Sequence, residues 1–197
     1  RGCGVVGAGL KPALTINGTR NRQCLFGEIV DGEMRLNDTG SVIERWWCEL
    51  NKKFPTVETG EFVVMPNHFH GIVVIAVGAD LRVGPVPCVG AAGTGVPTVQ
   101  TGANPTHQGA HIGAPLPTII QWFKTMTTNE YMRGVKTLGW IPFRGRLWQR
   151  NYYEHVIRAE DELDRIRRYI EDNPGMWEMD RENPAAQKTK GKESWLV

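Results

Sequence analysis

The stretch Glu61-Phe-Val-Val-Met-Pro-Asn-His-Phe-His-Gly-Ile-Val-Val-Ile-Ala76 decides the fold that this chain can adopt. Its two ends are rich in β-branched and aromatic residues, which favour strands, and Pro66-Asn67 between them favours a turn. We therefore expect two adjacent strands, at 61–65 and 69–76, that are partly buried on both faces.

Two further elements are expected on the N-terminal side of this strand pair. Residues 24–30 and 33–36 flank Asp31-Gly32, which suits the positive φ angles of a two-residue hairpin turn. Residues 37–39 offer helix N-caps, and apolar side chains then recur at a helical period as far as Pro55. The sequence thus predicts a hairpin followed by a helix.

The C-terminal half begins with a segment of unusual composition. Residues 83–123 contain no Asp, Glu, Lys or Arg, and Gly, Pro, Ala, Thr and Val predominate up to Pro115. This composition predicts a flexible insertion at about 78–115. Three elements are expected after it: a helix at 116–133, an extended segment at 147–157 and a last helix at 159–173.

This order of elements predicts an α+β fold, in which an antiparallel sheet and packed helices form a ferredoxin-like sandwich. We expect a single domain at 20–179, interrupted by the insertion. The Gly-rich residues 1–19 are predicted to form an irregular arm, and the charged residues 180–197 a flexible tail.

The bulk composition restricts the classes of protein to which the chain can belong. A formal net charge of +2 is too small to indicate a nucleic-acid partner, so any such partner must be argued from local clusters. The four cysteines form no CxxC pair and follow no secretory signal peptide, which predicts a cytoplasmic protein. No apolar stretch is long enough to span a bilayer, so no membrane partner is expected.

His68 and His70 are the most informative polar residues. Residues i and i+2 of a strand project to the same face, so both imidazoles can hold one metal ion, while Phe69 points into the core. The alternative is a pair of histidines that are only hydrogen-bonded or solvated. Two ligands rarely complete a catalytic metal site, and Asn173 is our candidate for a third. It lies one helical turn after Tyr169, on the same flank of the last helix.

Three segments together resemble one family. They are Met65-Pro-Asn-His-Phe-His-Gly-Ile-Val-Val74, Leu147-Trp-Gln-Arg-Asn-Tyr-Tyr-Glu-His-Val-Ile-Arg158 and Arg168-Tyr-Ile-Glu-Asp-Asn-Pro174. In this order and spacing they are similar to the REP-associated tyrosine transposases, within the IS200-like single-tyrosine HUH transposases. The similarity covers roughly residues 20–182 without the insertion.

The resemblance implies a metal-dependent endonuclease and strand transferase that acts on single-stranded or hairpin DNA through a 5′-phosphotyrosine intermediate. By this resemblance Tyr169 is the nucleophile, His68 and His70 are metal ligands, and Asn173 stands where other members have Gln. His155 is expected to support the site or to orient the last helix. The implied cofactor is Mg²⁺ or Mn²⁺, and the implied state is a monomer or a homodimer.

A DNA surface is expected between residues 133 and 150, where no acidic residue occurs. Cationic side chains neutralise phosphates, and aromatic rings stack on unpaired bases. The candidates are Arg133, Lys136, Arg144, Arg146, Trp148 and Arg150. The alternative is a solvated basic loop whose aromatic residues belong to the core.

Other interpretations stay open from the sequence alone. Tyr152 and Tyr153 are rival nucleophiles, but neighbours in a strand face opposite ways, so at most one of them can reach the site. A second alternative is a catalytically inactive module that binds DNA hairpins, motivated by the absence of the aromatic-rich first strand of the family. A third is a metallohydrolase that activates water at the two histidines.

Overall fold

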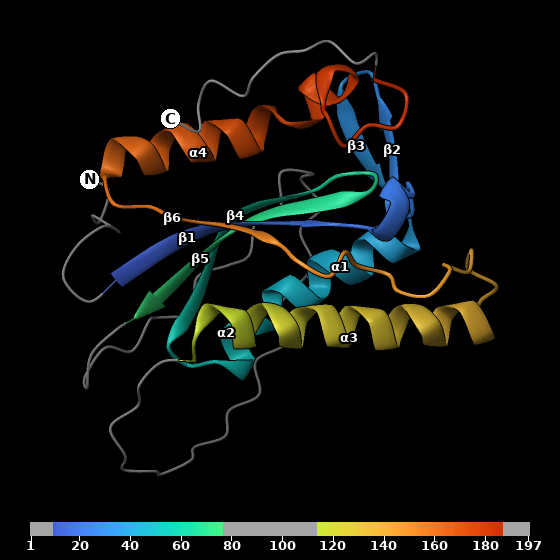
Figure 1. The fold of residues 1–197 in the computed structure, drawn as a ribbon, viewed down its shortest axis with the longest axis horizontal. Helices are drawn as coiled ribbons and strands as arrows, with labels where there is room; N and C mark the ends of the chain where they lie inside the picture. The colour runs from blue at the N-terminus through green and yellow to red at the C-terminus, as the bar shows by residue number, and fades with distance from the viewer. Residues whose placement is uncertain (1–9, 77–113, 187–197) are drawn as a thin grey trace.

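The computed structural model of the chain describes residues 10–76 and 114–186. Four strands form one antiparallel sheet in the order β4-β5-β1-β6 (Figure 1). These strands are β1 (Leu10–Gly18), β4 (Val57–Val64), β5 (His68–Ala76) and β6 (Tyr153–Val156). The α-helices are α1 (Asp38–Cys48), α2 (Leu50–Lys53), α3 (Leu116–Thr137) and α4 (Glu160–Asp172).

The connections between the strands are those of a ferredoxin-like fold. β5 lies between β1 and β4 and is antiparallel to both, so β1 and β4 run parallel, with α1 and α2 in the connection between them. In the same way β1 separates β5 from β6, and α3 connects these two. Two interleaved strand-helix-strand units make the split βαβ arrangement, which confirms the predicted α+β class.

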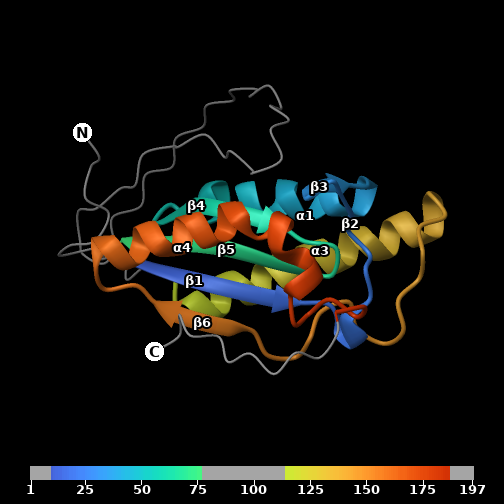
Figure 2. The same cartoon turned by 90° about the horizontal axis from the view of Figure 1, so that it is seen from above.

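Helices cover both faces of the sheet. α1 and α3 pack on one face, where the ring of Trp47 lies 4.6 Å from that of Phe69 and 5.5 Å from that of Phe123, between centroids. On the other face α4 packs through three buried apolar side chains, Leu163, Ile166 and Ile170. Seen from above, α4 runs along the sheet (Figure 2). β5 therefore contributes to two separate cores.

A separate hairpin precedes α1, formed by β2 (Gly27–Val30) and β3 (Glu33–Leu36). Its turn residues Asp31 and Gly32 have φ angles of 54° and 79°, as the Asp-Gly pair predicted. The side chain of Asn37 then accepts a hydrogen bond from the backbone N–H of Gly40 at 3.0 Å and caps α1. The hairpin forms a two-stranded sheet of its own rather than an extension of the main sheet.

Several expected boundaries are wrong. Residues 10–18, assigned to an irregular arm, form β1, which pairs with β5 on one side and β6 on the other. Pro12 and the flanking glycines hide this strand in the sequence, and pairing on both sides overrides the weak local preference. The extended segment predicted at 147–157 is a strand only in β6, and the helix predicted at 116–133 continues to Thr137.

The terminal and inserted segments complete the comparison with the expected domain limits. The insertion predicted at 78–115 lies outside the described residues except for its last two, and the described part of the expected tail, 180–186, makes hydrogen bonds with the domain. Within the described ranges no helix combines the length and apolarity needed to cross a membrane.

Gly71 in β5 allows the closest approach between the sheet and α1. A Cβ atom at this position would lie 2.4 Å from Cζ2 of the fully buried Trp47. Gly71→Ala should therefore lower the free energy of unfolding by about 1–3 kcal/mol, because the indole has no free space into which to move. Urea denaturation measures this change.

Gly175→Ala is the matched control, because a Cβ there would meet no atom within 4 Å. It should change the free energy of unfolding by less than about 0.5 kcal/mol. Equal stability of the two variants would show that Trp47 does not pack on β5 as described.

Candidate functional site

Two buried imidazoles project from the start of β5 onto the face of the sheet that α4 covers. His68 is 1% exposed and His70 is 2% exposed, and their ring centroids are 4.6 Å apart. Phe69 between them points to the other face and packs on Trp47. The alternation along β5 thus places both imidazoles on one side, as predicted from the sequence.

Tyr169 of α4 lies beside His70. The two rings meet edge to face, with centroids 5.4 Å apart. The buried stripe of Leu163, Ile166 and Ile170 presses α4 on the sheet, and Tyr169 follows on the flank of that stripe. The structure therefore brings Tyr169 next to two predicted site residues, His68 and His70, that precede it by about 100 positions in the sequence.

Asn67, in the turn before β5, joins three segments of the chain. Its side-chain Nδ2 donates to the backbone carbonyls of Arg22 at 3.1 Å and Glu182 at 2.7 Å. Its Oδ1 lies 2.8 Å from Nδ1 of His68. Asn67 is only 1% exposed, so these contacts are made away from bulk water. Sequence reasoning treated Asn67 only as a turn residue and missed these contacts.

The segment after α4 covers His68 from the other side. It forms the short 3-10 helix η2 (Pro174–Met179), in which the ring of Trp177 stacks near His68 with centroids 6.1 Å apart. Oδ2 of Asp180 then lies 3.4 Å from Nε2 of His68. Residue 180 was expected to begin a flexible tail, and an isolated Asp in a charged segment carries no sequence signal that would have indicated this contact.

Burial sets the protonation of these groups. It lowers the pKa of His68 to about 3 and moves the pKa of His70 well below its usual value, with the neighbouring His68 adding to the effect. Burial also raises the pKa of the Asp180 carboxyl. At neutral pH both imidazoles are therefore uncharged, and each keeps one ring nitrogen with a free electron pair.

The two imidazoles fit a divalent cation. Both ring nitrogens of His70 are buried and have no hydrogen-bond partner among the described residues, and an unpaired buried polar group costs about 1–3 kcal/mol. Neutral imidazoles are common ligands of first-row transition metals. The described part of the chain has no group of three or more His, Cys, Asp or Glu side chains placed to hold a metal. Water, an amide or a bound substrate would have to complete such a site.

Asn173 was predicted as the amide ligand. It is 4% exposed and stands at the C-terminus of α4, one turn after Tyr169. Within the described residues no hydrogen bond joins its side chain to either imidazole, so its part in a metal site stays a prediction.

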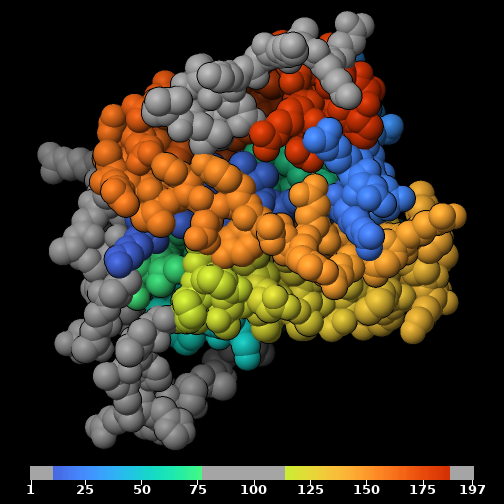
Figure 3. Space-filling view, viewed as in Figure 1, coloured from blue at the N-terminus to red at the C-terminus, as the bar shows by residue number. Residues whose placement is uncertain are grey.

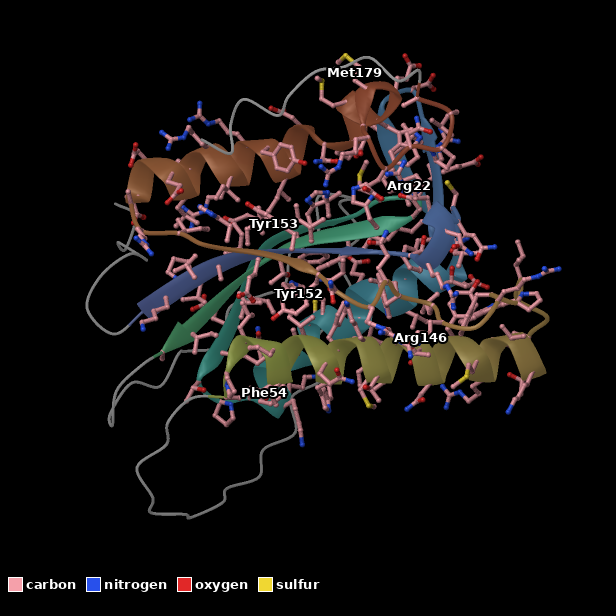
Figure 4. All side chains as sticks on the ribbon, in the orientation of Figure 1. Arg22, Phe54, Arg146, Tyr152, Tyr153 and Met179 are labelled. Carbon is pink, nitrogen blue, oxygen red and sulfur yellow. The ribbon has the colours of Figure 1, made fainter. Side chains whose placement is uncertain are left out.

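The rival tyrosines, Tyr152 just before β6 and Tyr153 at its start, face opposite ways (Figure 4). Tyr152 lies on the α3 side, where Nζ of Lys124 is 5.4 Å from its ring centroid. Tyr153 is paired with Ile16 of β1, which in turn is paired with His70, so it shares the face of the histidines. Of the two rivals, the phenol of Tyr153 therefore lies on the same face as the histidines, two strands away from His70.

His155 of β6 connects the sheet to α4. Its Nε2 lies 2.7 Å from Oε1 of Glu162, and the other carboxylate oxygen of Glu162 accepts the backbone N–H of Arg158 at 2.9 Å. The hydrogen bond from the backbone of Arg158 lowers the pKa of Glu162 most, and the contact with His155 lowers it further. The contact holds the start of the helix that carries Tyr169, although a supporting role of His155 in function stays a prediction.

The lowered pKa makes the contribution of Glu162 to stability dependent on pH. A carboxyl whose folded pKa is below its usual value of 4.5 stabilises the fold above that value, and the effect is lost as the pH falls through the folded pKa. Glu162→Gln should therefore lower the free energy of unfolding at about pH 7 and change it much less at about pH 3. Urea denaturation at the two pH values tests this, with the exposed Glu171→Gln of the same helix as control. A constant difference would contradict it.

The predicted DNA-contact residues divide into two groups. Five cationic residues are exposed: Arg133, Lys136, Arg144, Arg146 and Arg150. Arg133 pairs with Glu130 at 2.9 Å. Trp148 is only 4% exposed, packs on Phe26, and donates its Nε1–H to the hydroxyl of Thr127 at 2.9 Å. The prediction that Trp148 stacks on bases is wrong, because its ring is buried in the core and its N–H is already used within the fold.

The structure adds two arginines to this surface. η1 (Arg20–Arg22) lies against the basic loop, residues 138–152 between α3 and β6, where the backbone N–H of Arg20 donates to the carbonyl of Leu147 at 2.8 Å. A Cβ at Gly145 would lie 2.6 Å from Nη1 of Arg20, so this guanidinium reaches over the loop. Figure 3 shows these N-terminal residues in blue beside the orange loop. Asn21 and Arg22 adopt left-handed φ angles of 62° and 55°.

The chain is similar in sequence to a curated protein and, at lower identity, to solved structures. No protein-family model matches the chain. An uncharacterised protein of Haemophilus influenzae (strain ATCC 51907 / DSM 11121 / KW20 / Rd) is 34% identical over 170 residues, which are 82% of this chain and 79% of that protein.

Two solved structures are similar at lower identity. One is a REP-associated tyrosine transposase bound to a REP hairpin, with 14% identity, a TM-score of 0.45, and 88% of this chain and 71% of that chain covered. The other is a candidate transposase of Deinococcus radiodurans R1, with 16% identity, a TM-score of 0.43, and 87% and 95% covered. Neither likeness is close enough to decide the fold or the activity of this chain, which rest on its own residues.

Proposed function

The chain belongs to the same family as the Haemophilus influenzae protein, and from its site we propose a function for it: a single-tyrosine HUH transposase that cuts and rejoins single-stranded DNA. The proposal is supported chiefly by the edge-to-face contact of Tyr169 with His70, next to the buried pair of imidazoles. A phenol as nucleophile, two neutral imidazoles that can bind a cation and an arginine surface for phosphates can together support transfer of a DNA strand to tyrosine.

The chemical step is a transesterification. The phenol oxygen of Tyr169 attacks a backbone phosphorus, a bond between that oxygen and phosphorus forms, and the bond from phosphorus to the 3′ oxygen breaks. The phenol loses its proton and the 3′ oxygen gains one, so the products are a 5′-phosphotyrosine and a free 3′-OH. Attack of a 3′-OH on the phosphotyrosine reverses the step, and rejoining therefore needs no ATP.

Several residues have assigned parts in this step. A phenol has a pKa of about 10 and is a weak nucleophile at neutral pH, so α4 must hold Tyr169 in line with the scissile bond. His68 and His70 would hold Mg²⁺ or Mn²⁺ with Asn173 as a further ligand, and such an ion would supply Lewis-acid stabilisation of the charge that develops in the reaction. His155 supports the helix through Glu162.

The DNA would lie across the joined surface of η1 and the basic loop. This surface carries Arg20, Arg22, Arg144, Arg146 and Arg150. The stretches 10–27 and 131–153, which contain η1 and the basic loop, have no Asp or Glu. The nearby carboxylate of Glu182 lies 3.3 Å from Nε of Arg22 and so partly neutralises that arginine. Figure 4 shows Arg22 and Arg146 at the same end of the molecule.

The inactive hairpin-binding module was motivated by a first strand that departs from the family pattern. In the structure residues 10–18 form β1, which lies in the interior of the sheet and pairs along its full length with β5. The motive for this alternative is therefore removed, and cleavage assays decide between it and the proposed transposase.

Tyr169→Phe should abolish the covalent complex with DNA, because the variant lacks the attacking oxygen. Purified protein is incubated with Mn²⁺ and a labelled hairpin or single-stranded oligonucleotide, and the protein-DNA adduct is separated under denaturing conditions. His68→Ala with His70→Ala should also abolish cleavage and retain DNA binding.

Tyr153→Phe is the control, since this phenol is on the same face of the sheet but two strands from His70. It should still form the adduct. If Tyr169→Phe still forms the adduct and Tyr153→Phe does not, Tyr153 is the nucleophile and the assignment of Tyr169 is wrong. Cleavage without any adduct that survives both changes would favour the metallohydrolase.

Arg20→Ala combined with Arg146→Ala should weaken binding of single-stranded DNA and reduce the slope of log K against log salt by roughly 1 to 2, because two phosphate contacts are lost. Fluorescence anisotropy at several salt concentrations measures both quantities. Arg165→Ala is the control, because this exposed arginine of α4 lies away from the basic loop and pairs with Asp161 at 3.0 Å. The proposed surface is wrong if the double variant and the control bind alike.

A further inference from the structure

We propose that Asn67 is a positioning residue, which fixes the proton of neutral His68 on Nδ1 and thereby keeps Nε2 as an electron-pair donor. Only the use of that electron pair, as a metal ligand in strand transfer, rests on the proposed function. The assignment of the proton rests on the hydrogen bonds of the turn between β4 and β5.

The orientation of the Asn67 amide is determined by its neighbours. Its Nδ2 lies 2.7 Å from the carbonyl oxygen of Glu182 and 3.1 Å from that of Arg22. Carbonyl oxygens can only accept hydrogen bonds, so the two N–H groups of the amide must face them. Rotation of the amide by half a turn would place its own oxygen against two carbonyl oxygens, at a site that is 1% exposed.

The orientation of the amide determines the tautomer of His68. With Nδ2 turned toward the carbonyls, Oδ1 faces Nδ1 of His68 at 2.8 Å, and this oxygen can only accept. Nδ1 must therefore carry the proton. A neutral imidazole has a single N–H, so Nε2 keeps its electron pair.

The surroundings of Nε2 agree with an ion at this nitrogen. Oδ2 of Asp180 lies 3.4 Å from Nε2, so an electron pair and a carboxyl oxygen face each other inside the protein. Such a contact is stabilised by a cation or a proton between the two atoms. The adjacent imidazole of His70 lies on the same face of the sheet as His68. Both of its ring nitrogens have no hydrogen-bond partner among the described residues.

The turn itself is held in place by other contacts, which separates positioning from support of the fold. The backbone carbonyl of Asn67 accepts from Thr19, and the carbonyl of Pro66 accepts from Leu25 and Phe26. These bonds do not involve the Asn67 side chain. Truncation of that side chain should therefore allow the proton of His68 to move to the other ring nitrogen without unfolding the turn.

The tautomer is measured by long-range ¹H–¹⁵N correlation spectra of the protein labelled with ¹⁵N-histidine, free of metal and DNA. The chain has 5 histidines, and His68→Gln identifies the signals of His68. We expect the wild type to show a protonated Nδ1 and an unprotonated Nε2 at His68. Asn67→Ala should shift the population toward the Nε2–H form.

Glu182→Gln is the matched control, because it removes the carboxylate that pairs with Arg22 but keeps the backbone carbonyl that Asn67 uses. It should leave the tautomer unchanged. Titration with Mn²⁺, followed by electron paramagnetic resonance, should show an affinity lower by about 10- to 100-fold in Asn67→Ala and close to the wild type in the control.

An Nε2–H tautomer at His68 in the metal-free wild type would overturn the proposal, even if no variant of Asn67 folds. An unchanged tautomer in folded Asn67→Ala would overturn it as well. Since no DNA is present in these measurements, the expected tautomer together with a lack of DNA cleavage would reject the proposed function and leave the role of Asn67 intact.

Discussion

The packing of α4 on the sheet is the interaction on which the candidate site depends. Leu163, Ile166 and Ile170 are each at most 5% exposed, and full burial of such a side chain stabilises the fold by about 1.5–3 kcal/mol. This seam places Tyr169 against His70 and, through the turn into η2, brings Trp177 and Asp180 over His68. A helix that lifted from the sheet would separate the phenol from the imidazoles and also expose the second core.

β5 serves two functions because its faces are chemically different. Toward α1 and α3 it presents Phe69 and the space above Gly71, which the indole of Trp47 fills. Toward α4 it presents the two imidazoles. The aromatic core packs tightly on this strand, and the two imidazoles stand 4.6 Å apart, between centroids, without any ligand. Such preorganisation lowers the cost of binding an ion, since little ordering remains to be done.

The sequence predicted those parts of the site that follow from local periodicity. The alternation of His68-Phe69-His70 and the helical spacing of Tyr169 to the apolar stripe are properties of single elements, and the structure has both. The contacts made by Asn67 and Asp180 depend on where distant segments meet, which no local pattern encodes. Trp148 was misassigned for a related reason: its neighbours are basic, but its ring is enclosed by Phe26 and Phe123, which come from elsewhere in the chain. β1 was missed because Pro12 weakens the strand preference that its two partners then impose.

The direction of β5 separates the site from the least regular part of the sequence. The strand of nine residues begins at His68 and ends at Ala76, and the Gly- and Pro-rich segment follows Ala76 in the sequence. At about 3.3 Å per residue, the end of the strand is roughly 20–26 Å from the two histidines. Residues can therefore be added to or removed from this connection during evolution, or a reporter domain grafted there, without altering the spacing of the reactive groups.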